Sequence, residues 1–189
     1  MELSDPTSTR QIVLNTSSDI LSEKDVRIAL QHATNKQNIS DGIFYGLEKP
    51  ADTLFAKTIP YCNIDLEPFT YDLELAGQIL DDAGWKMGSG NVREKDGKQL
   101  NIDLLYNSDS VTEKSIAEYL QSEYQTIGVS LNIHGEEEQS YRDNMKAGNF
   151  DMVFNICWGT PYDPQSSLAA MRAPVYGDYA AQLGLDDKA

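Results

Sequence analysis

Trp158 and Tyr162 are the residues of this chain best placed to contact a ligand. They follow the apolar run 150–156, in the segment Trp158-Gly159-Thr160-Pro161-Tyr162-Asp163-Pro164. An apolar run of this length is typical of a strand buried on both faces in the centre of a covered sheet. In open α/β sheets, ligands bind beyond the carboxyl ends of such strands. The sequence therefore predicts that both aromatic side chains lie at a ligand site rather than in the core.

No pattern indicates catalysis or a bound metal. His32 and His134 are far apart, have no metal-site spacing, and are read as ordinary hydrogen-bonded histidines. The acids at 136–138 are expected in the first turn of a helix, where they complement its dipole. Asp81 and its neighbour Asp82 are read as helix-surface acids. Nucleophile motifs, a phosphate loop and a glycine fingerprint are absent from the sequence, so we expect no enzyme and no cofactor.

Charge and composition exclude several classes of partner. The formal net charge is −15, with 30 acidic and 15 basic residues, so nucleic acid and anionic membrane surfaces are disfavoured. No apolar run reaches the length of a membrane span. The start of the chain lacks a secretory signal pattern, and its charged end stops within what looks like the opening of a helix, which predicts an excised piece of a longer protein. Cys62 and Cys157 suggest no disulfide framework.

Periodicity predicts one α/β domain over residues 1–189. Apolar residues at helical spacing predict helices over 24–36, 71–83, 110–127 and 136–147. Alternation predicts strands over 100–106 and 129–133, followed by the apolar strand that begins at Phe150. Ser22 with Asp25 resembles a capping box, whereas 86–98 is read as a charged, glycine-rich excursion. The β-α-β-α-β order from residue 100 predicts parallel strands with helices packed against them.

Three motifs resemble a known family, the extracytoplasmic solute-binding proteins of ABC importers for peptides, nickel and related solutes. Residues 25–36 resemble the family's "VRxALxxAxxK" helix, and 76–85 resemble its "AxxLLxxAGW" element. Residues 158–164, with 171–174 and 178–185, are similar to the nickel-binding branch. The resemblance implies a lobe of the type II periplasmic-binding-protein fold, with a mixed, mainly parallel sheet covered by helices. The chain would be most of the second, C-terminal lobe of a two-lobed protein.

The resemblance also implies a function and a location. The expected role is capture of nickel, or of a nickel–chelator complex, in an aromatic cleft between two lobes, and delivery to the permease subunits of an ABC importer. The full-length protein would be extracytoplasmic, either periplasmic or anchored at the cell surface by a lipid, and is expected to be a monomer. A dipeptide- or oligopeptide-binding protein of the same family is the alternative.

Four residues are implied as ligand-binding by the resemblance. Trp158 and Tyr162 match the family's cleft aromatics, and Arg172 and Tyr176 lie in the following segment. Tyr176 stands where nickel-binding relatives carry a histidine. Because a protonated phenol is a poor nickel ligand, recognition of a pre-formed chelate is expected, with no metal ligand from this chain. An arginine that grips the chelator's carboxylates would come from the missing lobe.

Plainer interpretations of these four residues stay open. Trp158 could be core packing and Tyr162 could rigidify a proline-flanked turn, whereas Tyr176 could lie on the surface. Arg172 is better suited to pair with a nearby acid than with a ligand.

Two other classes of protein also remain. A small hydrolase or transferase would have to use Asp109, Asp151 or Asp163, and an interaction or sensor module would need a non-transport partner.

Overall fold

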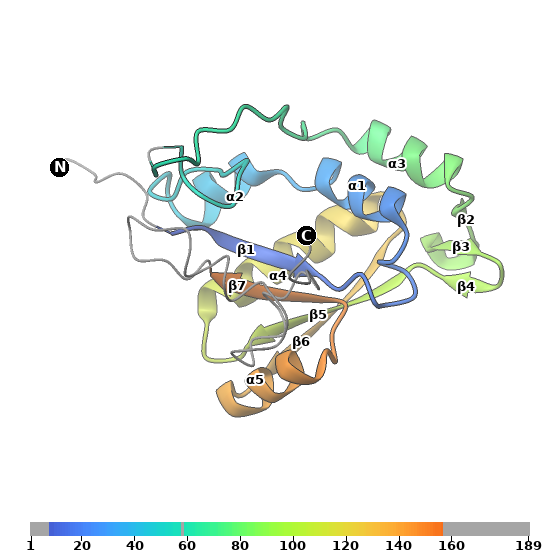
Figure 1. Cartoon of the computed structure of the whole chain (residues 1–189). Coiled ribbons are helices and arrows are strands. Elements are labelled where there is room, and N and C mark those ends of the chain that lie inside the picture. The colour runs from blue at the N-terminus through green and yellow to red at the C-terminus, as the bar shows by residue number, and fades with distance from the viewer. Residues whose placement is uncertain (1–7, 58, 157–189) are drawn as a thin grey trace, which may run out of the picture.

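The computed structural model describes residues 8–57 and 59–156 as an α/β lobe built on a four-stranded sheet (Figure 1). The strand order is β1-β7-β5-β6, where β1 is Arg10–Leu14, β5 is Asn101–Asn107, β6 is Ser130–Glu136 and β7 is Met152–Ile156. β5 pairs in parallel with both β6 and β7, and β1 pairs antiparallel with β7. The predicted α/β class and mixed, mainly parallel sheet are confirmed.

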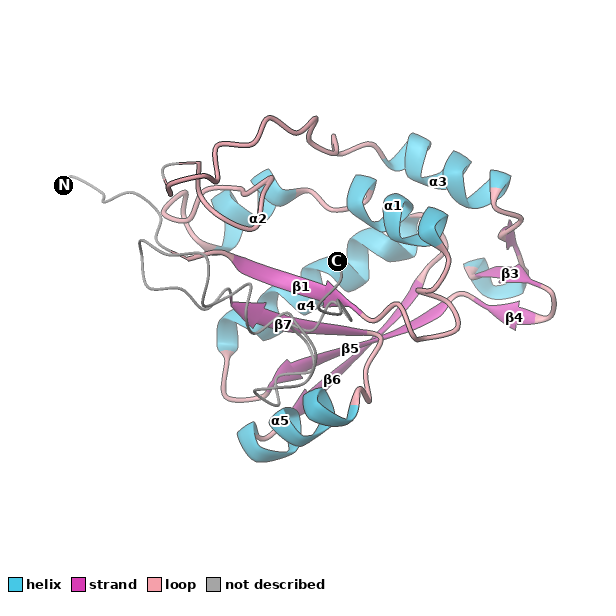
Figure 2. Cartoon of the chain, viewed as in Figure 1, coloured by secondary structure: helices cyan, strands magenta, loops and turns pink. Residues whose placement is uncertain are grey.

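Helices cover both faces of this sheet (Figure 2). The larger core, on one face, takes residues from α1 (Lys24–His32), α3 (Leu73–Asp82) and α4 (Val111–Thr126), and Ile39 and Ile43 of α2 (Lys36–Ile43) pack against it. A smaller cluster on the other face includes residues of α5 (Glu138–Ala147). No helix in the described ranges is both long enough and apolar enough to cross a bilayer.

The predicted β-α-β-α-β unit is present from β5 to β7. Alternation at the start of β5 places Ile102 and Leu104 in the larger core. The Ser110 hydroxyl caps α4 by accepting the backbone N–H of Glu113 at 3.2 Å. Gly128 follows α4 with φ +81°, the left-handed conformation that lets the chain turn into β6.

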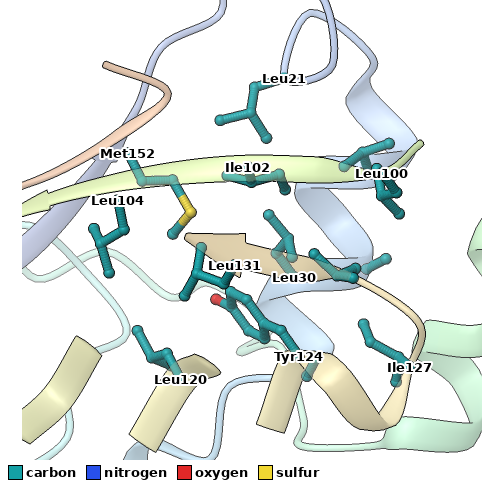
Figure 3. Packing of buried hydrophobic residues seen from close by; sticks show 14 of the residues in the cluster. Leu21, Leu30, Leu100, Ile102, Leu104, Leu120, Tyr124, Ile127, Leu131 and Met152 are labelled. Atoms are coloured by element: carbon teal, nitrogen blue, oxygen red, sulfur yellow. The ribbon is translucent and has the colours of Figure 1, made fainter. Parts of the chain in front are cut away.

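The larger core joins this unit to the helices before it. Figure 3 shows Leu30 of α1 together with Leu120 and Tyr124 of α4, near Ile102 and Leu104 of β5. All five side chains are buried. Burial of one such side chain contributes about 2 kcal/mol, so this packing fixes α1 and α4 against the sheet.

Two predictions about the first helices are wrong. The capping box is absent, because α1 begins after Glu23, no side chain caps it, and the Ser22 hydroxyl donates to the carbonyl of Asp19. The predicted helix over 24–36 is also interrupted. Asn35 starts the separate helix α2 by accepting the backbone N–H of Asn38 at 3.0 Å. Because an N-cap residue has non-helical backbone angles, a single helix cannot continue through Asn35.

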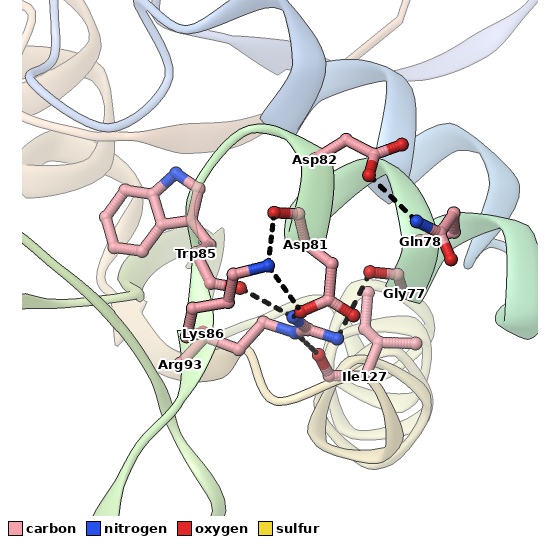
Figure 4. Close-up of polar contacts among 8 residues, drawn as sticks. All are labelled: Gly77, Gln78, Asp81, Asp82, Trp85, Lys86, Arg93 and Ile127. Atoms are coloured by element: carbon pink, nitrogen blue, oxygen red, sulfur yellow. Dashed lines mark hydrogen bonds and ion pairs between the residues drawn. The ribbon is translucent and has the colours of Figure 1, made fainter.

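The 86–98 segment is an ordered three-stranded sheet, not a loose excursion. Its strands are β2 (Lys86–Met87), β3 (Arg93–Lys95) and β4 (Lys98–Gln99), with the short 3-10 helix η1 (Ser89–Asn91) between β2 and β3. Arg93 is buried and holds this sheet against α3 and the end of α4 (Figure 4). Asp81, read from the sequence as a surface acid, accepts a hydrogen bond from Arg93 and is structural.

Candidate ligand-binding edge

β7 is the strand that leads into the predicted ligand site. It lies between β1 and β5, and Met152, Val153 and Phe154 are all buried. Met152 and Phe154 belong to the larger core, whereas Val153 packs with Tyr141 of α5 on the opposite face. The prediction of an interior strand buried on both faces is confirmed. The residues proposed to bind ligand lie beyond it and outside the described residues: Trp158, Tyr162, Arg172 and Tyr176, and with them Cys157 and Asp163.

A network of carboxylates occupies the carboxyl edge of the parallel strands. At the end of β5, the backbone N–H of Asn107 donates to Glu113 at 2.9 Å, and its side-chain amide donates to Glu138. Burial raises the pKa of Glu113, and the charge of Glu138 raises it further; the hydrogen bond from Asn107 and the charge of Arg10 act against this. Glu113 and Glu138 lie in the first turns of α4 and α5. Two helix N-termini that could attract an anion therefore already face the protein's own carboxylates.

This arrangement determines which ligand groups the edge can accept. Glu136 adds a third carboxylate, which accepts the Ser140 hydroxyl at 2.7 Å. The described cations near the edge already have anionic partners, since Arg142 contacts Glu138 and Arg10 contacts Glu48. A free carboxylate on a ligand would be repelled here, whereas hydrogen-bond donors and cationic or neutral groups would not.

Arg10 connects β1 to this edge and was not identified from the sequence. It pairs in register with Ile156, the last residue of β7. Its guanidinium lies 3.3 Å from a carboxylate oxygen of Glu48 and 5.5 Å from the ring centre of Phe44. The apolar residues 12–14, followed by the polar turn residues 15–18, were the signal for this strand.

Both histidines are hydrogen-bonded, as expected. His32 Nδ1 lies 2.7 Å from the carbonyl oxygen of Thr70, and His134 Nε2 lies 3.2 Å from Asp103. His134 is inside β6, which extends to Glu136, three residues beyond the strand predicted over 129–133. Among residues 8–57 and 59–156, no group of three or more histidine, cysteine or acidic side chains is arranged to hold a metal ion.

A cavity of about 490 Å³ lies at the opposite end of β7 from the predicted site. Its walls include Asn15, Asp103, His134 and Asp151, all polar. Asp151 precedes β7 and accepts the backbone N–H of Asp103 at 2.9 Å. Asp109, in contrast, follows the carboxyl end of β5. Because the two strands are parallel, Asp109 and Asp151 lie at opposite edges of the sheet and cannot form an acid–base pair.

Comparison with known proteins decides the family. Residues 2–178 match the family described as "Bacterial extracellular solute-binding proteins, family 5 Middle". The chain belongs to this family. Its members are binding proteins of transport systems, not enzymes, which agrees with the absence of a catalytic motif in the sequence.

Individual members of family 5 are similar over nearly the whole chain. The nickel-binding periplasmic protein of Escherichia coli is 41% identical over 188 residues, which is 99% of this chain and 36% of that protein. The crystal structure of NikA from Brucella suis in complex with Fe(III)-EDTA has a TM-score of 0.89 at 44% identity, covering 99% of this chain and 38% of that one. The dipeptide-binding protein of E. coli is 27% identical over 157 residues, or 83% of this chain and 28% of that protein. The chain thus spans little more than a third of the first two of these proteins.

Proposed function

We propose that this chain is most of the second lobe of a solute-binding protein that captures nickel or a nickel–chelator complex for an ABC importer. The observation that carries the proposal is the 41% identity with a nickel-binding protein, sustained over 188 residues. Identity with the dipeptide-binding protein is 27% over a shorter stretch. The same comparison supports an extracytoplasmic location and permease subunits as partners. The full-length protein is proposed to act as a monomer, without a cofactor of its own.

The proposed ligand is a pre-formed chelate rather than a bare ion. No group of three or more histidine, cysteine or acidic side chains in the described residues is arranged to hold a metal, and Tyr176 stands where the resemblance implies a histidine. A related protein of 44% identity was crystallised with a whole chelate, Fe(III)-EDTA. Trp158 and Tyr162 would hold a planar chelator by stacking and by a directed hydrogen bond. Arg172 and Tyr176 are proposed as further contacts.

The described residues at this edge support different roles for the two lobes in ligand binding. Among the described residues at this edge, Arg10 and Arg142 already pair with Glu48 and Glu138, which leaves neither of them free for an anionic chelator. The charge of the chelator's carboxylates would then be balanced by basic residues of the other lobe. This lobe would supply aromatic surface, and closure of the two lobes around the complex would create the transport signal.

Calorimetric titration of the full-length protein tests the proposal. The titrants are nickel chloride, the nickel–histidine complex, histidine alone and short peptides. We expect the nickel–histidine complex to bind more tightly than the bare ion, with no heat from peptides or from histidine alone. Tight binding of dipeptides or oligopeptides, with no response to either form of nickel, would refute the nickel assignment and favour the peptide-binding alternative.

A further inference from the structure

Two large apolar side chains project from a short turn after α2. The turn runs from Phe44 to Glu48, and is called here the 44–48 turn. Tyr45 is 84% exposed and Leu47 is 61% exposed. Single exposed apolar residues are common on protein surfaces, but two on one turn form a small apolar projection.

The 44–48 turn lies near the carboxyl end of β7. Arg10 contacts both ends of the turn, through the ring of Phe44 and the carboxylate of Glu48. The same Arg10 pairs in register with Ile156, two residues before Trp158. Figure 1 places α2 at the end of the molecule toward which β5 and β7 point. The 44–48 turn, with Tyr45 and Leu47, is therefore at the carboxyl edge of the sheet, near the last residue of β7.

Hydrogen bonds hold the turn in one conformation. The carbonyl of Ser40 accepts the backbone N–H groups of Phe44 and Gly46, at 3.2 and 2.9 Å, and Leu47 N–H donates to the Phe44 carbonyl at 2.9 Å. The Ser40 hydroxyl also donates to the carbonyl of Glu48. Tyr45 has φ +55°, a left-handed conformation that is unfavourable for a bulky residue. Such strain persists where the surrounding structure enforces it, and it recurs at functional sites. The side chain is thus held outward on a rigid support.

We infer that Tyr45 and Leu47 contact the other lobe of the full-length protein when the cleft closes. This inference rests on the proposed two-lobed function. The chain spans 36% of its nickel-binding relative, so nearly two thirds of such a protein lies outside it and is available to cover this surface. An opposing lobe that closes over the carboxyl edge of the sheet would also reach a projection at that edge. The contact would stabilise the closed state and so increase ligand affinity.

Photo-crosslinking in the full-length protein tests the contact directly. A benzoylphenylalanine replaces Tyr45 in one sample and Met87 in a control. Met87 is 52% exposed and lies beside Gly128, which precedes β6 at the amino edge of the sheet. We expect position 45 to crosslink within the same molecule to residues outside this chain, with a higher yield when saturating nickel–histidine is present. Position 87 should give no such product.

Two results would overturn the inference. One is the absence of any product joining position 45 to residues outside this chain, with and without ligand. The other is a product formed only between two protein molecules, which would make the turn a self-association surface.

Affinity gives a second readout. Tyr45→Ala should weaken ligand binding about tenfold by destabilising the closed state, while Met87→Ala changes it less than about twofold. Equal effects of both substitutions would also contradict the contact.

The crosslinking result and the ligand assignment can fail separately. If calorimetry shows peptides as the only ligands, the crosslink at position 45 is measured with a bound peptide and is still expected to increase. If nickel–histidine binds but position 45 gives no product outside this chain, the proposed function stands and the closing contact is wrong.

Discussion

The guanidinium of Arg93 donates a hydrogen bond to Asp81 across 2.9 Å, joining the three-stranded sheet to α3. Its other N–H groups donate to the carbonyls of Trp85, Ile127 and Gly77, at 2.6, 2.7 and 3.2 Å (Figure 4). A single buried cation thus satisfies backbone acceptors from three separate segments. Only arginine presents enough fixed donors to do so.

Replacement of Arg93 should destabilise the lobe strongly. Arg93→Ala leaves the carbonyls of Gly77, Trp85 and Ile127 with one hydrogen bond fewer in a buried site, and we expect a loss of about 3 kcal/mol in the free energy of unfolding. Lys86 also contacts Asp81 but is well exposed, so Lys86→Ala should cost less than about 0.5 kcal/mol. Urea denaturation of both variants measures the difference. Equal stabilities would show that Arg93 is not the anchor of this sheet.

Gly128→Ala should cost more than Gly97→Ala. Both glycines have positive φ, +81° and +78°, so alanine introduces backbone strain of about 1 kcal/mol at either position. At Gly128 a Cβ would also lie 2.8 Å from Cγ of Arg93, whereas at Gly97 nothing lies within 4 Å. Comparison of the two variants therefore separates the backbone strain from the effect of the Cβ contact. Thermal unfolding measures the stability of each variant. A Gly97 variant that is as unstable as the Gly128 variant would contradict this account of the Arg93 site.

Tyr124 predicts a loss of stability at high pH. Burial raises the pKa of this phenol to about 12, and a hydrogen bond with Thr34 opposes the shift only partly. Its ordinary pKa is 10.0, so the folded state holds the proton more tightly than the unfolded chain. The stabilisation is complete below pH 10 and disappears as the pH rises from about 10 to about 12.

The comparison with Tyr124→Phe isolates this effect. Relative to the variant, the wild-type protein should lose about 2 kcal/mol of unfolding free energy between these pH values. Urea denaturation at several alkaline pH values measures the difference, and other tyrosines and lysines affect both proteins alike. A constant difference across this range would show that Tyr124 ionises as freely in the folded state as in the unfolded one.

The parts of the fold that were predicted correctly have strong local signals. The β5–α4–β6 unit shows alternation, helical spacing, a Ser110 cap and a glycine stop, and each of these is present in the structure. β1 was missed because its only local signal is the short apolar run 12–14 before the polar turn residues 15–18. The break at Asn35 was missed although asparagine is a common helix cap.

Long-range polar contacts could not be predicted in this way. Arg93 binds partners up to 34 residues away, three of them backbone carbonyls that carry no residue-specific signal. Arg10 reaches the ligand edge only because β1 pairs with β7. The paired residues are far apart in the sequence; Ile12 and Phe154, for example, are 142 residues apart. The candidate site was inferred differently, from the apolar run before Trp158 and from a family resemblance. Both observations are properties of sequence and do not require side-chain geometry.

Nickel–histidine titration of Trp158→Ala in the full-length protein tests the central proposal most directly, with Met87→Ala as the matched control. An aromatic side chain at the centre of a binding site contributes about 2 kcal/mol or more, so Kd should rise roughly thirtyfold. Unfolding temperature is measured alongside, to separate binding from folding. A Trp158→Ala protein that is folded and binds nickel–histidine with unchanged Kd would contradict the aromatic site.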